Sequence, residues 1–93
     1  MPKAIVDPAE LHRFAASLGG IVGILRDRRN AVNGEFKALH EAWRDKKYEQ
    51  FERSFSEMVE RFNRFTDESE RYAKYLRGKA RKAEAYLQGD YGR

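Results

Sequence analysis

A single break in a regular apolar rhythm most constrains how this chain can fold. Apolar residues recur at steps of three or four, or at sums of these steps, from Leu11 to Trp43 and again from Tyr48 onward. The step from Trp43 to Tyr48 is five, and because a helix turns about 100° per residue, the extra residue would displace the apolar stripe from its face. The sequence therefore predicts an all-α fold, an antiparallel two-helix hairpin that turns at Trp43, Arg44 and Asp45.

Capping residues mark the ends of the two predicted helices. Asp7 followed by Pro8 is a helix-start signal, and Asp45 suits the N-cap of the second helix. Glycines follow Leu87 and end that helix. We therefore expect one helical-hairpin domain, 1–93, with helices over about 8–43 and about 46–87 and a flexible tail over 88–93.

A three-helix alternative stays open, because two internal signals could break the helices. Asn33-Gly34 is a common turn pair, and the segment from Asp67 to Glu70 has the spacing of a capping box. Against this alternative, the apolar phase continues through both points, and few residues remain for loops, which usually take about 2–8 residues. Its helices would cover 8–32, 35–65 and 67–88.

The apolar stripes of both helices are wider than the seam of one hairpin requires. Hairpins with wide stripes usually bury the excess by pairing into a four-helix bundle, and a monomer of this length has a marginal core. We therefore expect a homodimer, or a heterodimer with a related helical hairpin. The predicted hairpin and dimer core consists of Leu11, Phe14, Leu18, Ile21, Leu25, Phe36, Phe51, Phe55, Phe62, Phe65 and Leu76.

The sequence does not favour catalysis, and we expect no cofactor and no metal. His12 and His40 are 28 residues apart on one predicted helix, roughly 42 Å along its axis. Neither has an acidic residue three or four positions away, as the metal sites of helical bundles require. Cysteine is absent, and no glycine-rich phosphate loop occurs. No apolar run approaches a membrane span, and no apolar segment suggests a cleavable signal peptide.

The net charge of +4 is a property of the C-terminal end. Residues 71–93 hold seven Lys and Arg against two acidic residues, whereas the first seventy residues hold twelve against thirteen. We prefer to explain this by the helix dipole, which favours cations at a helix C-terminus, because the cations lack interleaved aromatic residues on one face. The basic patch comprises Arg71, Lys74, Arg77, Lys79, Arg81 and Lys82.

The midpoint Trp43 with its phase slip, the length of the chain and the absence of cysteine carry a family resemblance. The chain resembles the WXG (Trp-x-Gly) family, small helical hairpins that are substrates of type VII (ESX-type) secretion systems. Asp45 stands where that family has Gly. Tyr86 and Asp90 match the family's C-terminal Tyr-x-x-x-Asp/Glu signal, which the secretion machinery reads.

The resemblance implies a non-enzymatic interaction protein that acts as a secretion substrate, or as the partner or chaperone of one. A secretion ATPase or a toxin would then be its partner, and it would be cytoplasmic before export without a cleavable signal peptide. Two alternatives remain open. One is a cytoplasmic helical protein with a structural or regulatory role, and the other is a module whose basic residues bind nucleic acid or an anionic membrane.

Overall fold

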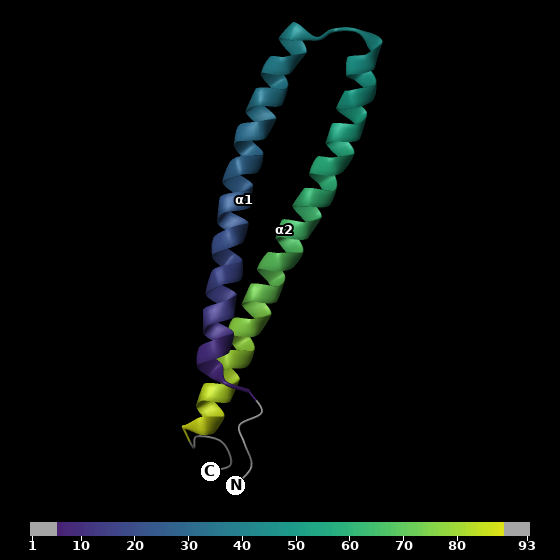
Figure 1. The fold of residues 1–93 in the computed structure, drawn as a ribbon. Coiled ribbons are helices and arrows are strands. Elements are labelled where there is room, and N and C mark those ends of the chain that lie inside the picture. Colours follow the sequence, from purple (N-terminus) through teal and green to yellow (C-terminus); the bar gives the residue numbers. More distant parts are fainter. Residues whose placement is uncertain (1–5, 89–93) are drawn as a thin grey trace.

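The computed structural model describes residues 6–88 of the chain, and these form two long antiparallel helices (Figure 1). Helix α1 covers Pro8–Ala42 and helix α2 covers Lys46–Leu87. The molecule measures 70 × 19 × 17 Å along its principal axes. The predicted all-α hairpin with a reversal at Trp43 is therefore confirmed.

The two helix starts follow from their capping residues. The Asp7 side chain accepts a hydrogen bond of 3.0 Å from the backbone N–H of Ala9, and the Asp45 side chain accepts one of 3.1 Å from Tyr48 N. Each bond satisfies one of the amides that a helix N-terminus leaves unpaired. At the other end, Gln88 N donates to Glu84 O at 2.9 Å. Residues 89–93, where we expected a flexible tail, lie outside the described residues.

The three-helix alternative is wrong, because neither internal signal interrupts a helix. Helix α1 continues through Asn33 and Gly34, and α2 continues from Asn63 to Glu70. An interior glycine costs about 1 kcal/mol relative to alanine, which the packing along a 35-residue helix offsets. In α2 the Thr66 hydroxyl donates to the carbonyl of Asn63 at 3.1 Å, a bond made within the helix.

The helices lie close together near the termini and further apart near the turn (Figure 1). Small side chains explain the close end, since they let two helix backbones approach each other. The fully buried residues at this end have short side chains, and none of them is in the predicted core: Ala15, Val22, Thr66, Ser69, Ala73 and Ala80. The predicted core favoured large apolar residues, so it did not include the small ones that are buried most deeply at this end.

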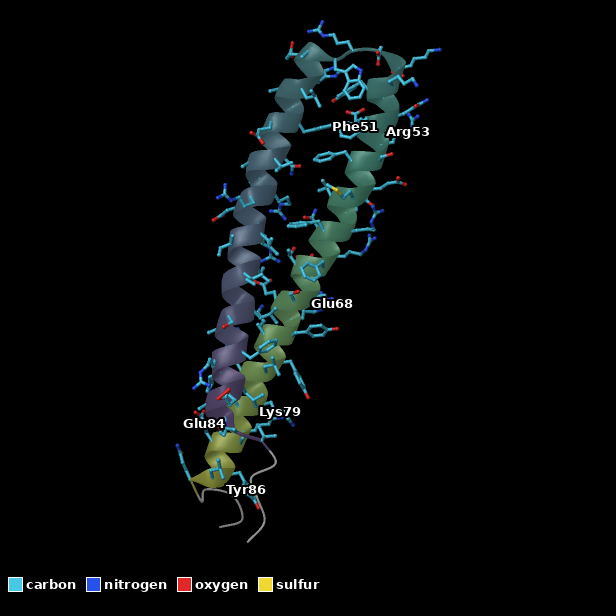
Figure 2. The ribbon with its side chains drawn as sticks, in the orientation of Figure 1. Phe51, Arg53, Glu68, Lys79, Glu84 and Tyr86 are labelled. Atoms are coloured by element: carbon cyan, nitrogen blue, oxygen red, sulfur yellow. The ribbon has the colours of Figure 1, made fainter. Side chains whose placement is uncertain are left out.

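Aromatic rings fill the wider end of the seam. Phe36 of α1 stacks on Phe55 with ring centroids 4.3 Å apart and on Tyr48 with centroids 5.7 Å apart. Trp43 packs edge-on against Tyr48 at 5.6 Å, and Phe51 lies 5.7 Å from the indole. Figure 2 shows side chains occupying the space between the helices near Phe51. Rings of this size keep the helices apart without leaving the seam empty.

Polar contacts connect α1 to α2 at the middle of the hairpin, between the end with small buried residues and the end with aromatic rings. Arg26 of α1 pairs with Asp67 at 2.8 Å and with Glu70 at 3.3 Å across the seam. These carboxylates raise the pKa of Arg26, and the hydrogen bond with Glu70 is the largest cause. One turn away, the Arg29 guanidinium donates to the side-chain oxygen of Asn63 at 2.7 Å. The small-residue end and the aromatic end are thus held in one register.

Candidate interaction surface

The predicted core separates into two groups of side chains in the hairpin. Seven of its members are half-buried between the helices: Leu11, Leu18, Leu25, Phe36, Phe55, Phe62 and Leu76. The other four are exposed: Phe14, Ile21, Phe51 and Phe65. A row of residues spaced by seven drifts by about 20° per heptad around a straight helix, so a wide stripe cannot fit entirely into one seam. The expected excess of apolar surface is therefore present on the hairpin.

An open apolar groove of about 160 Å³ runs between the helices on one side of the seam. Its apolar walls come from both helices and are Leu25, Val32, Phe55, Met58, Val59 and Phe62, with Arg28, Arg29 and Asn33 beside them. The exposed surface that lines this groove is almost entirely apolar. The groove lies on the side of the hairpin where exposed apolar side chains are concentrated.

Exposed apolar residues extend this groove along both helices. Residues seven apart share a helix face, so Leu39 lies in line with Val32 of the groove, and Phe51, Phe65 and Tyr72 lie in line with Met58. Ile21 and Phe14 are one turn from Leu25 and Leu18 on the same side. We call this surface the apolar face; it comprises Phe14, Ile21, Val32, Leu39, Phe51, Met58, Phe65 and Tyr72.

The exposed area of the molecule is large for its mass. The accessible surface is 7562 Å², whereas a compact protein of 10.9 kDa exposes about 5,600 Å². The excess, about 2,000 Å², accompanies an elongated shape with a radius of gyration of 20.9 Å, where a compact chain of this length has about 12 Å. The hairpin thus exposes more surface than a compact protein of its mass, as two helices packed side by side must.

The opposite side of the seam has a different character. A hollow of about 300 Å³ lies there between small residues of α1 and charged residues of α2, including Ala16, Gly20, Gly23, Lys74 and Arg77. A Cβ atom added to Gly19 would lie 3.2 Å from the guanidinium of Arg77. Gly19 therefore makes room for that side chain, and this side of the hairpin is polar.

The turn residues form a small hydrogen-bonded unit. The Trp43 indole Nε1 donates to Asp45 Oδ1 at 2.7 Å, and Arg44 pairs with Glu41 at 2.8 Å. Trp43 is half-buried against the aromatic end of the seam. Of the three predicted turn residues, Trp43 and Asp45 are therefore joined to each other, whereas Arg44 pairs with Glu41 at the end of α1.

The residues of the proposed secretion signal are only partly described. Tyr86 lies in the last turn of α2 and is exposed (Figure 2). Asp90 lies outside the described residues. The sequence alone identified this pair.

The two histidines contact different partners at opposite ends of the hairpin. His12 Nε2 lies 3.2 Å from Glu84 Oε1, and the ring of His40 packs on Tyr48 with ring centroids 4.8 Å apart. Sequence reasoning missed the His12–Glu84 contact because 72 positions separate the two residues. Within residues 6–88, no group of three or more His, Asp or Glu side chains could hold a metal ion.

Tyr48 is the buried titratable group of the aromatic end. Burial raises the pKa of its phenol, and the nearby carboxylate of Glu52 raises it further. Tyr48 was expected only as an apolar position, because a repeat of apolar residues does not show which ring becomes enclosed.

Comparisons with known proteins give no relative. No protein-family model, no curated protein and no solved structure matches this chain. Neither helix, within the described residues, is apolar enough over a sufficient length to cross a membrane.

Proposed function

We propose that this protein is a non-enzymatic interaction module that pairs through its apolar face with a second helical hairpin. The second hairpin is another copy of the chain or a related chain, and the product is a four-helix bundle. The observation that carries this proposal is the continuity of the apolar face across both helices, with the open groove at Val32 and Met58 in its middle.

The exposed surface of the whole hairpin is large enough for such a pairing. Two hairpins that each covered an excess of about 2,000 Å² would form an interface in the range of obligate dimers, about 2,000–5,000 Å² in total. Aromatic residues and methionine, which are enriched in interface cores, form much of this face. Phe51, Met58 and Phe65 are its members on α2.

We further propose that the module belongs to type VII secretion, as a substrate or as the partner or chaperone of one. The resemblance to WXG proteins supports this, together with the position of Trp43 at the apex of a two-helix hairpin. Tyr86 at the end of α2 is where a signal following the second helix would begin. A secretion ATPase or a toxin would be the partner of the assembled bundle.

Charge substitution on the apolar face tests the pairing. Ile21→Glu and Met58→Glu place carboxylates at the centre of the proposed interface, where burying an unpaired charge is strongly unfavourable. We expect sedimentation equilibrium to give a dimer for the natural chain and a smaller species for the double variant. The matched control is Ala31→Glu with Ser56→Glu, which adds the same charge at exposed positions away from the groove and should leave the dimer intact.

The proposal would be wrong if both double variants sedimented like the natural chain. Unchanged association in the Ile21→Glu and Met58→Glu variant would show that the apolar face is not the interface. Equal dissociation in the control variant would show that added charge alone, and not its position, separates the chains.

A further inference from the structure

The helix dipole does not account for the basic patch. The dipole acts within the last turn of a helix, and the last turn of α2 holds no basic residue. Lys82, the last cation of the patch, lies five positions before the helix ends at Leu87, and the intervening charged residue is Glu84. The explanation that the sequence favoured is therefore wrong, and the cations need another one.

Three of the acidic residues near the basic patch are engaged by α1. Asp67 and Glu70 pair with Arg26, and Glu84 contacts His12. As a result, no ion pair reaches the patch from the part of the chain that the structure describes. The cations of the patch, none of which takes part in these ion pairs, are Arg71, Lys74, Arg77, Lys79, Arg81 and Lys82. Folding of the hairpin thus engages three of the nearby carboxylates and leaves six cations against Glu68, which lies beside Arg71 at the edge of the patch.

An exposed aromatic ring lies among these cations. Tyr75 is 65% exposed and lines a shallow hollow of about 270 Å³ together with Lys74, Gly78, Lys79 and Lys82. The expectation that no aromatic residue interleaves with the patch is therefore wrong. Figure 2 shows Lys79 on this part of α2.

The six cations surround more than half of the helix. At 100° per residue they cover an arc of about 200°, from Arg77 beside Gly19 through Lys74 and Arg71 to Lys79. A flat membrane surface meets only one side of a helix, so it would leave part of this arc unused. The major groove of double-stranded DNA is about 12 Å wide, accepts one α-helix and has phosphates on both walls. The corresponding groove of double-stranded RNA is too narrow for a helix.

We propose that residues 71–82 of α2 bind double-stranded DNA through its phosphates. The cations contact the two walls of the major groove, and Tyr75 projects between them toward the DNA. This binding does not depend on pairing of the apolar face, because Arg71, Lys74 and Arg81 lie away from that face on α2. It carries no sequence specificity, since contacts to phosphates position a protein without reading bases.

Fluorescence anisotropy with a duplex DNA of mixed sequence, about two helical turns long, tests the proposal on the full chain. The observed association constant should fall steeply between about 50 and 200 mM salt, with a slope of about −0.9 for each phosphate contacted. The variant Lys74→Gln, Lys79→Gln, Lys82→Gln removes three contacts. We expect its affinity at about 100 mM salt to fall more than tenfold and its slope to become shallower by about 2.7.

The control removes the same charge at the other end of the molecule. Lys37→Gln, Lys46→Gln, Lys47→Gln changes three exposed lysines near the turn, and its affinity should stay within about twofold to threefold of the natural chain. All six substituted lysines are exposed, so circular dichroism should show unchanged helix content in both variants.

Three results would overturn the proposal. One is the absence of duplex binding at about 50 mM salt. Another is an equal loss of affinity in the patch variant and in the control, because binding would then follow net charge alone. The third is binding to phosphatidylglycerol vesicles without binding to the duplex, which would identify a membrane surface as the partner.

Discussion

The indole Nε1 of Trp43 donates a 2.7 Å hydrogen bond to Oδ1 of Asp45, and the same oxygen accepts the backbone N–H of Tyr48. One carboxylate oxygen therefore holds the central tryptophan and caps the second helix. Asp45 has φ −94° and ψ −177°, an extended conformation that any residue can adopt, so this turn does not need glycine. This explains how a Trp-x-Asp sequence forms the reversal without a glycine.

Substitution of Asp45 should weaken the turn. Asp45→Ala removes both hydrogen bonds, and loss of an N-cap to alanine typically costs about 1 kcal/mol, whereas replacement by glycine costs only a few tenths. Urea unfolding at one fixed protein concentration measures the change. Asp45→Asn, which retains a capping oxygen, should lie close to the natural chain. An Asp45→Ala variant as stable as the natural protein would show that the carboxylate contributes nothing to the turn.

Enlarging the small residues of the close end should destabilise the hairpin. Ala73 and Ala80 are fully buried where the helices approach most closely, and overpacking a dense core typically costs about 1–3 kcal/mol. Ala73→Leu and Ala80→Leu should therefore lower the midpoint of thermal unfolding. The control is Ala38→Leu at an exposed position of α1, where a surface substitution usually changes stability by less than about 0.5 kcal/mol. Equal midpoints for all three variants would contradict a close-packed seam.

Alkaline pH should destabilise the aromatic end through Tyr48. Burial, and then Glu52, raises the pKa of this phenol above its ordinary value of 10.0. Because the folded pKa is the higher one, the stabilisation is complete below pH 10.0 and is lost as the pH rises through the folded pKa. Thermal unfolding from neutral pH to above pH 10.0 should show this loss. Tyr48→Phe should reduce the loss, and Tyr72→Phe, on the exposed apolar face, should retain it.

Export should depend on the C-terminal signal and not on the fold. Tyr86 is an exposed residue of the last turn of α2, so Tyr86→Ala should leave the helices intact, as should Asp90→Ala. If the protein is a type VII substrate, each change should greatly reduce its amount in the culture medium of its native host while the cellular amount persists. Normal secretion of both variants would remove the signal assignment.

The hairpin could be predicted because its determinants are local. The five-residue step between Trp43 and Tyr48, and the caps Asp7 and Asp45, lie within one or two turns of what they control. The continuous apolar phase through Gly34 also correctly outweighed a strong turn signal, because long-range packing overrides a local propensity.

The details of the seam could not be predicted, because they depend on residues far apart in the chain. Arg26 contacts Glu70, which lies 44 positions away in the sequence, and His12 contacts Glu84, which lies 72 positions away. These pairs determine which cations stay unpaired, so the basic patch was misread as a dipole effect. Likewise, the heptad rows alone did not show that Ala73 would be enclosed while Phe65 stayed exposed.

Sedimentation equilibrium of the unmodified chain at micromolar concentration tests the central claim most directly, when combined with thermal unfolding of the same sample. We expect a folded species of twice the 10.9 kDa chain mass, because the apolar face needs a second hairpin to cover it. A folded species of 10.9 kDa that unfolds cooperatively would contradict the account, since the hairpin would then be stable with its apolar face in water.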